Sequence, residues 1–258
     1  MRKDSSKGPI YCIGDSHVNL FSGYDRLQRK WPHPSRDRLP QFKVYRVGAG
    51  LAYNLRELGT TMGARERLLE AIETIPPESQ ILLCFGEIDC RFHLIRHAEK
   101  TSKNWDDVAE ECAARYFEGL QVLIEKRFKV SVYNVIPSAR QSKIDKKFPT
   151  TGTCLERNNM TQLFNAALRE KCSQKGLPFV ESFESLINQK GLTKSVYYLD
   201  KVHLAQRALP HIMRAIENAL PDFKFEKPKY HSIRIFGSWL HLIFRVGRLL
   251  QILRPNVD

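Results

Sequence analysis

The chain has 258 residues, enough for one large domain with a full core, and its 42% hydrophobic and 27% charged residues are ordinary for a globular protein. It contains no apolar run long enough to span a membrane and no secretory signal, which predicts a cytoplasmic protein. The net charge of +13 favours an acidic partner, but it is spread along the chain without an RNA-binding signature or zinc finger, which disfavours nucleic acid.

The six cysteines form no Cys-x-x-Cys pair and no zinc-like cluster. Cys12 and Cys84 lie within apolar, strand-like runs, where a thiol behaves as a small hydrophobic side chain. The cysteines are therefore expected to be reduced and structural, and the sequence calls for no metal or cofactor.

Short apolar runs alternate with helical patterns along the first 220 residues. The runs that predict strands are 10–13, 43–47, 80–85, 130–136 and 178–180. The segments with helical spacing are 51–58, 64–75, 105–128, 156–173 and 205–220. Polar segments at 19–41 and 138–153 are expected to be loops. The alternation predicts a three-layer α/β/α, flavodoxin-like domain over residues 1–220, with a parallel sheet of about five strands.

The tail, residues 221–258, differs in character from this domain. Residues 232–253 are strongly apolar but contain five polar or basic residues spaced four, three, four and three apart, namely Arg234, Ser238, His241, Arg245 and Arg248. This spacing predicts an amphipathic helix with one narrow basic stripe. Such a helix either lies on an anionic membrane surface, here the inner face of the cytoplasmic membrane, or packs on its own domain or a partner.

The first predicted strand runs directly into Gly14-Asp15-Ser16-His17. Ligands of open α/β sheets bind beyond the carboxyl ends of the strands, so Ser16 is a candidate nucleophile. A serine needs a base to take its proton, and His203 is the candidate for that base. Asp200 precedes it by three residues, close enough to share one turn and to orient the imidazole.

These blocks, in this order, resemble the SGNH/GDSL hydrolase superfamily over residues 10–220. Gly14-Asp15-Ser16-His17 matches the first block, with histidine at the place of the usual leucine, and Asp200-Lys201-Val202-His203 matches the last. The resemblance implies Ser16 as nucleophile, with His203 as base and Asp200 as its orienter. It also implies an oxyanion hole formed by the backbone N–H groups of Ser16 and of Gly48 or Gly50.

The third block, Gly-x-Asn-Asp in the family, corresponds to Gly86-Glu87-Ile88-Asp89, so Ile88 replaces the asparagine that donates to the oxyanion. Loss of one such donor typically lowers the rate about a hundred- to a thousand-fold. The candidates for a substitute donor are Arg91, Asn54 and His93. Further site candidates beside these blocks are Asp15, His17, Glu87 and Asp89. The variant third block resembles that of members linked to polysaccharide biosynthesis, which suggests a saccharide substrate.

The sequence thus predicts a serine-dependent acyl-ester hydrolase or O-acyltransferase whose substrate is an acylated saccharide or a lipid-linked glycan. One alternative is a catalytically weak or inactive glycan-binding or scaffold domain, because of Ile88. A second alternative is a metallophosphoesterase-like hydrolase that uses Asp15 and His17, although its further metal-binding motifs do not occur. The sequence does not predict an oligomeric state.

Overall fold

A computed structural model describes residues 8–140 and 146–223, so the predicted amphipathic helix at 232–253 lies outside the described residues. Five parallel strands form one sheet in the order β2-β1-β3-β4-β5. They are β1 (Ile10–Gly14), β2 (Phe42–Arg46), β3 (Gln80–Cys84), β4 (Lys129–Tyr133) and β5 (Phe179–Val180). The predicted α/β class and five-stranded parallel sheet are confirmed.

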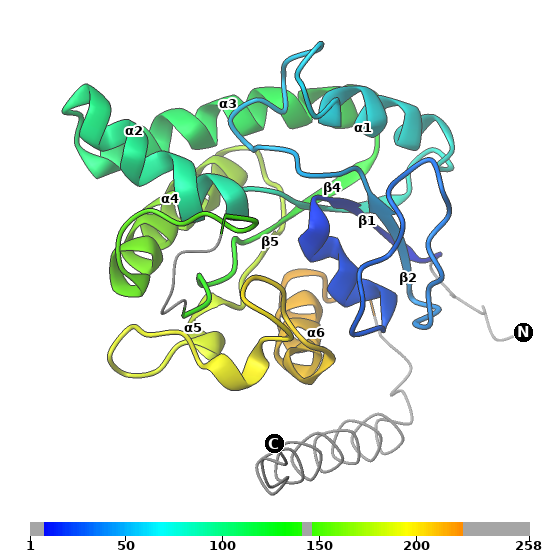
Figure 1. Ribbon diagram of the computed structural model, residues 1–258. Coiled ribbons are helices and arrows are strands. Elements are labelled where there is room, and N and C mark those ends of the chain that lie inside the picture. Colours follow the sequence, from blue (N-terminus) through cyan, green and yellow to red (C-terminus); the bar gives the residue numbers. More distant parts are fainter. Residues whose placement is uncertain (1–7, 141–145, 224–258) are drawn as a thin grey trace, which may run out of the picture. The chain divides into compact units, whose positions relative to one another are not determined.

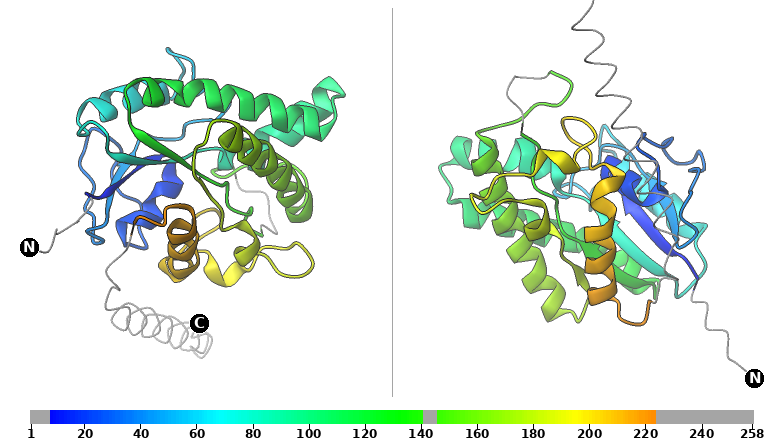
Figure 2. Two further views of the ribbon diagram at one scale, coloured as in Figure 1. Left: turned by 180° about the vertical axis from the view of Figure 1, so that it is seen from behind. Right: turned by 90° about the horizontal axis from the view of Figure 1, so that it is seen from below.

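Helices cover both faces of this sheet (Figures 1 and 2). One face carries α1 (Ala64–Glu73), α3 (Trp105–Glu125) and α4 (Cys154–Gln174). The other carries the 3-10 helix η1 (Ser16–Ser22) and α6 (Leu209–Ala219). The shorter elements are the π-turn η2 (Asp89–His93), α2 (Leu94–Thr101), α5 (Phe183–Leu186) and the 3-10 turns η3 (Ser195–Tyr197) and η4 (Gln206–Ala208).

The larger part of the core lies between the sheet and α1, α3 and α4. Its fully buried side chains include Leu68, Leu83, Leu120, Val132 and Phe164. On the opposite face, the ring of Phe21 in η1 packs 5.1 Å from that of Phe42 and 5.8 Å from that of Tyr133. Burial on both faces explains why the inner strands are nearly continuous apolar runs.

Three segments differ from the sequence predictions. The helix predicted at 51–58 is wrong, because this segment forms turns whose backbone is held by the Asp89 carboxylate. The expected loop at 19–41 begins inside η1 and becomes irregular only after Ser22. Helix α2 was not predicted, because charged residues and histidines interrupt its short buried stripe of Leu94, Ile95 and Ala98.

Residues 8–140 and 146–223 contain no helix with both the length and the hydropathy needed to cross a membrane. All six cysteines are free, and all except Cys154 are buried. Cys12 and Cys84 lie in β1 and β3, where their thiols fill space in the core.

Candidate active site

Ser16, His203 and Asp200 form one continuous hydrogen-bonded chain. Ser16 begins η1 directly after β1, and its Oγ lies 2.8 Å from Nε2 of His203. Nδ1 of His203 lies 2.8 Å from Oδ2 of Asp200. The fold thereby joins a hydroxyl and an imidazole that are 187 residues apart in the sequence. The imidazole is 96% buried, so one ring nitrogen faces the serine and the other faces the carboxylate.

The turn that carries Asp200 and His203 is fixed by the aspartate itself. Its Oδ1 accepts hydrogen bonds from the backbone N–H of Val202 at 2.8 Å and of His203 at 2.7 Å. Aspartate commonly stabilises a turn in this way. Burial raises the pKa of Asp200, but the hydrogen bonds from His203 outweigh it and hold the pKa at about 2. A charged Asp200 favours the tautomer with the proton on Nδ1, which leaves Nε2 free to accept the serine proton.

The two glycines considered for the oxyanion hole differ in their backbone N–H groups. The N–H of Gly50 donates to the carbonyl oxygen of Gly48 at 2.9 Å, so it is already engaged. Within the described residues, the N–H groups of Ser16 and Gly48 donate to no protein acceptor. Val47 donates to the carbonyl of Gly14 at 2.9 Å, which places the β2 end alongside the β1 end. Gly48 is therefore the better candidate of the two.

Two of the three candidate substitute donors, Arg91 and His93, make other contacts. The buried Arg91 donates from Nε to Oε1 of Glu87 at 2.8 Å and from Nη1 to the Pro149 carbonyl. His93 is exposed, and its ring packs 4.9 Å from that of Phe92. In the described part of the chain, no hydrogen bond joins Arg91, His93 or the Asn54 side chain to Ser16.

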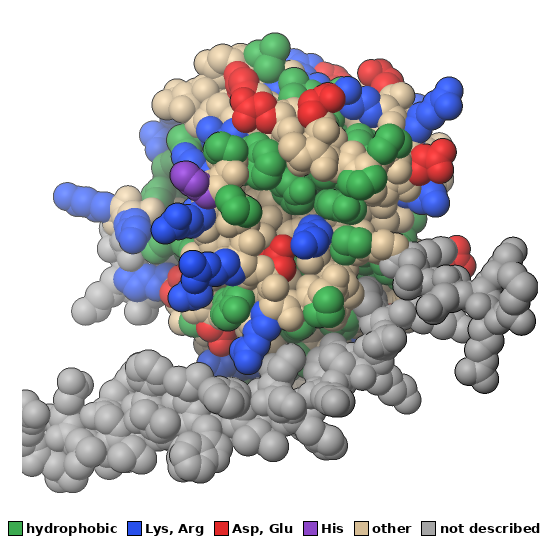
Figure 3. Space-filling view, turned by 90° about the vertical axis from the view of Figure 1, so that its right-hand side faces the viewer, with side chains coloured by type: hydrophobic (Ala, Val, Ile, Leu, Met, Phe, Trp, Pro, Cys, Tyr) green, Lys and Arg blue, Asp and Glu red, His purple; other side chains and the backbone are tan. Residues whose placement is uncertain are grey.

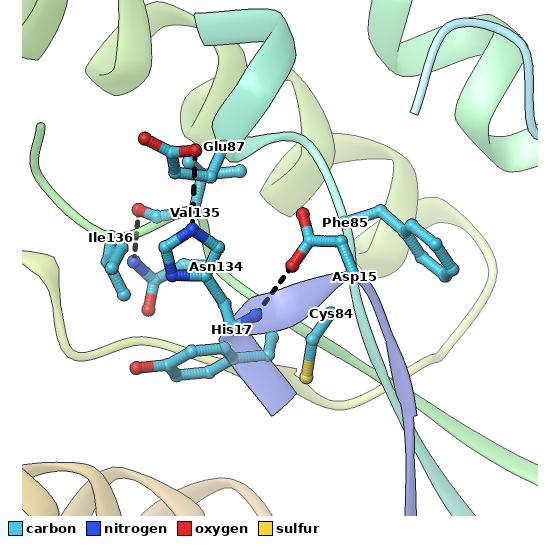
Figure 4. Close-up of a pocket in the computed structure, with 9 residues that line it drawn as sticks. Asp15, His17, Cys84, Phe85, Glu87, Asn134, Val135 and Ile136 are labelled. Carbon is cyan, nitrogen blue, oxygen red and sulfur yellow. Dashed lines mark hydrogen bonds and ion pairs between the residues drawn. The ribbon is translucent and has the colours of Figure 1, made fainter. Parts of the chain in front are cut away.

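A second cluster of buried side chains lies next to Ser16 and contains Asp15, His17, Glu87 and Arg91. Oδ1 of Asp15 accepts from the backbone N–H of His17 at 2.8 Å, and Nε2 of His17 lies 3.2 Å from Oε2 of Glu87 (Figure 4). Asp15, His17 and Glu87 line a small cavity of about 10 Å³, and the other residues around it are Cys84, Phe85, Tyr133, Asn134, Val135 and Ile136. The cluster therefore ties the turn after β1 to the turn after β3.

Burial and charge shift the pKa values of this cluster in opposite directions. Burial raises the pKa of Asp15 to about 6. Burial alone would lower the pKa of His17, but Asp15 and Glu87 outweigh it and the pKa is raised. For Glu87, burial is outweighed by His17 and Arg91, so the pKa is lowered. These directions favour an ionised Glu87 beside Arg91 and a His17 that holds its proton more tightly than a free imidazole does.

This arrangement bears on the metal-site alternative that begins from Asp15 and His17. The Nε2 of His17 faces Glu87, and Oδ1 of Asp15 caps η1. Across residues 8–140 and 146–223, no three His, Cys, Asp or Glu side chains are grouped so that they could hold a metal ion. A two-metal hydrolase needs several such ligands, so the geometry does not support this alternative.

Asp89 has a positioning role. Its buried carboxylate accepts from the backbone N–H of Ala52 at 2.8 Å and of Tyr53 at 3.2 Å. Burial raises its pKa to about 6. These bonds fix the segment that follows Gly48 and Gly50.

The sequence analysis did not identify three side chains that lie next to the site. The ring of Phe148 stands edge-on to that of His203 at 6.1 Å. Lys30 and Arg67 both lie close to Gly48. These residues occupy a loop or an ordinary helix, and no motif marks them.

Comparison with known proteins identifies the fold. No family model matches the chain, and no curated protein matches it. A predicted acylhydrolase from Bacteroides fragilis superimposes with a TM-score of 0.53 at 14% identity, over 85% of this chain and 89% of that one. A GDSL-like lipase from Bacteroides thetaiotaomicron gives a TM-score of 0.50 at 14% identity, over 84% and 89%. The structural neighbours are thus SGNH/GDSL-like hydrolases, and the chain has their fold.

Proposed function

We propose that this protein is a serine-dependent acyl-ester hydrolase or O-acyltransferase. The observation that carries the proposal is the Ser16–His203–Asp200 chain, with both hydrogen bonds at 2.8 Å. Nucleophilic catalysis by serine requires a base within hydrogen-bond distance of the hydroxyl and a third group that orients this base. The SGNH/GDSL fold, whose neighbours include a GDSL-like lipase, supports the same reaction class.

The geometry leads to the following acyl transfer. Oγ of Ser16 attacks the ester carbonyl carbon while its proton passes to Nε2 of His203, and Asp200 stabilises the imidazolium that forms. His203 then gives this proton to the departing alkoxide, which leaves an acyl group on Ser16. An acceptor hydroxyl, deprotonated by the same imidazole, attacks this acyl-enzyme and releases the serine.

The carbonyl oxygen becomes negative at each tetrahedral stage and needs hydrogen-bond donors. The open N–H groups of Ser16 and Gly48 are the proposed donors. Ile88 contributes no polar donor, and Arg91 is engaged by Glu87 and the Pro149 carbonyl. We therefore expect a slower enzyme than one with three donors, by about a hundred-fold or more.

The acyl acceptor determines which of the two enzymes this is. Water makes the protein an esterase, and a sugar hydroxyl makes it an O-acyltransferase. We further propose that the substrate is a saccharide or a lipid-linked glycan. The net charge of +13 favours a substrate that carries acidic groups. A membrane role for residues 232–253 stays a prediction, tested by comparing liposome binding of the whole chain with that of residues 1–230.

Fluorophosphonate labelling tests the reaction class directly, because the reagent reacts with activated serines. We expect the wild-type protein to be labelled and to hydrolyse phenyl acetate, and Ser16→Ala to do neither. Ser22→Ala is the matched control, since Ser22 lies on the same 3-10 helix and donates to the Asn19 carbonyl. It should be labelled like the wild type.

Two outcomes would overturn the proposal. Wild-type protein that is folded, unlabelled and inert toward phenyl acetate would favour the non-catalytic binding domain. Labelling that persists in Ser16→Ala would place the nucleophile elsewhere.

A further inference from the structure

Two basic side chains from different elements lie against Gly48, the glycine with the open N–H group. A Cβ built on Gly48 would lie 3.0 Å from Nη2 of Arg67 and 3.1 Å from Cδ of Lys30. Lys30 comes from the loop before β2, and Arg67 comes from α1. Two cations thus flank the β2 end, next to the turn that bears Ser16.

The backbone fixes the Arg67 side chain and the main chain next to Lys30. Arg67 donates from Nε to the Val47 carbonyl and from Nη2 to the Met62 carbonyl. The N–H of Trp31 donates to the Arg46 carbonyl at 2.8 Å, which holds the segment after Lys30 along the edge of β2. The Arg67 guanidinium is therefore held at Gly48, whereas the exposed Lys30 side chain is positioned only through its main chain.

Carboxylates balance the charges of these two cations only in part. Among the described residues, neither Lys30 nor Arg67 forms an ion pair within 4.0 Å. Glu66 is the neighbouring acid of Arg67. Its Oε1 accepts from the Gly59 N–H, and its charge still attracts that of Arg67. Arg67 also keeps N–H groups beyond the two that its carbonyl partners use, because a guanidinium has five.

Arg46 adds a third positive charge to the same strand end. It is the last residue of β2, in register with Gly14, and its buried Nε has no hydrogen-bond partner in the described part of the chain. Burial lowers the pKa of Arg46, and the charge of the nearby Asp15 acts against this shift.

The surrounding face is also basic. Lys and Arg side chains gather on the side of the molecule that carries β2 (Figure 3). The exposed basic residues on the loop and strand there are Arg26, Arg29, Lys30, Arg36, Arg38 and Lys43. The two acids within residues 23–46 accept hydrogen bonds, Asp37 from Ser35 and Val44 and Asp25 from Gln206. The resulting positive field would attract an anionic ligand toward the strand end.

We infer that Lys30 and Arg67 form a binding site for an anionic group, a phosphate or a carboxylate, on the substrate. A guanidinium with open N–H groups and an ammonium are the usual partners of both groups. The inference rests on the proposed function in one respect, because the substrate is taken to be the ester that Ser16 attacks. It narrows the substrate class to esters with a negative charge close to the reacting carbonyl.

Binding of inorganic phosphate tests the site without any reaction. We expect calorimetry at constant ionic strength, set with sodium chloride, to detect phosphate binding to the full-length wild type and to Ser16→Ala. Lys30→Glu and Arg67→Met should each weaken it about ten-fold or more, as expected for loss of a charge-assisted hydrogen bond. Lys129→Glu is the control, because Lys129 is exposed at the start of β4, at the opposite end of the sheet. Succinate in place of phosphate then shows which anion is preferred.

Fluorophosphonate labelling of the same proteins separates failure of this inference from failure of the proposed function. Anion binding that depends on Lys30 and Arg67 supports the site even if Ser16 is unlabelled, in which case only the esterase proposal fails. The inference is overturned if neither phosphate nor succinate binds, or if Lys30→Glu and Lys129→Glu bind alike. Because Arg67→Met also removes bonds to the Val47 and Met62 carbonyls, the exposed Lys30 carries the decision if that variant does not fold.

Discussion

Two carboxylate–histidine pairs lie at the carboxyl edge of the sheet, with their imidazole rings 5.3 Å apart. In one pair, His203 contacts Asp200 at 2.8 Å and the aspartate side chain is 41% exposed. In the other, His17 contacts Glu87 at 3.2 Å and both side chains are less than 10% exposed. One site therefore contains one carboxylate–histidine pair with a partly exposed carboxylate and one pair that is buried.

Their surroundings suit them to different tasks. Nε2 of His203 faces a hydroxyl, so a proton can be exchanged with a reacting group. Nε2 of His17 faces the buried Glu87 carboxylate, which also pairs with Arg91. This nitrogen therefore interacts with a structural anion and not with a reacting group. We interpret His203 as the base and His17 as part of a charge cluster that fixes the turns after β1 and β3.

Exchange of each histidine for glutamine gives the largest expected difference between the pairs. His203→Gln should lower kcat/KM for phenyl acetate about a thousand-fold or more, as loss of a triad base does in serine hydrolases. His17→Gln should lower it far less. His211→Gln is the control, because His211 bonds Tyr197 and lies on α6. An active His203→Gln beside an inactive but folded His17→Gln would reverse the assignment.

Removal of the Glu87 or Asp200 carboxylate should affect stability in the opposite order, with the larger loss at the buried pair. Glu87→Ala leaves the buried Arg91 and His17 without their anion, so the free energy of unfolding should fall by about 3 kcal/mol in urea titrations. Asp200→Ala should lower it by about 1 kcal/mol or less, because that carboxylate is screened by water. Glu73→Ala, which breaks the exposed pair with Lys126, is the control and should change little. Equal losses for Glu87 and Asp200 would contradict the interior role of the cluster.

The sequence predicted the half of the site that short-range motifs describe. Strand ends were readable from apolar runs, and Ser16 follows one of them directly. Asp200 and His203 share one turn, so a spacing of three residues was enough to pair them. The α/β order of elements then brings both segments to the same edge of the sheet.

The other half depends on contacts that no local pattern encodes. Arg91 was a candidate donor by its position after Ile88, but Glu87, four residues earlier on the same turn, pairs with it. Residues 51–58 have helical spacing, yet the Asp89 carboxylate, far along the chain, holds Ala52 and Tyr53 in turns. Lys30 and Arg67 meet at Gly48 only because a loop and a helix pack on the same strand end.

The dependence of stability on pH should also separate the interior from the edge. The pKa of Asp15 is about 6 when folded and 3.8 when free, so the folded state keeps a proton that the unfolded state releases between these values. Its stabilisation is full below about pH 4 and declines by about 2–3 kcal/mol as the pH rises to 6. The pKa of Asp200 is lowered to about 2, so its contribution is present above about pH 4 and is lost as the pH falls.

Urea titrations from pH 2 to 7 measure both effects. Asp15→Asn should flatten the decline between pH 4 and 6, and Asp200→Asn should flatten the rise between pH 2 and 4. Asp89 shares the direction of Asp15, because burial raises its pKa to about 6 as well. Asp15→Asn could leave the decline of the unfolding free energy above pH 4 unchanged while Asp89→Asn removes it. That result would show that Asp89, and not Asp15, has the raised pKa.

A modest expected change in stability distinguishes the backbone of the site from its side chains. Gly48 has φ +109°, and a Cβ there would press on Arg67 and Lys30, so Gly48→Ala should lower the free energy of unfolding by about 1–2 kcal/mol. Gly59 has φ +72° with open space around it, so Gly59→Ala shows the effect of backbone strain alone. If Gly48 supplies an oxyanion donor to the serine that His203 activates, only Gly48→Ala should also lower kcat for phenyl acetate. Equal kcat in both variants would remove Gly48 from the oxyanion hole and leave Ser16 as its remaining proposed backbone donor.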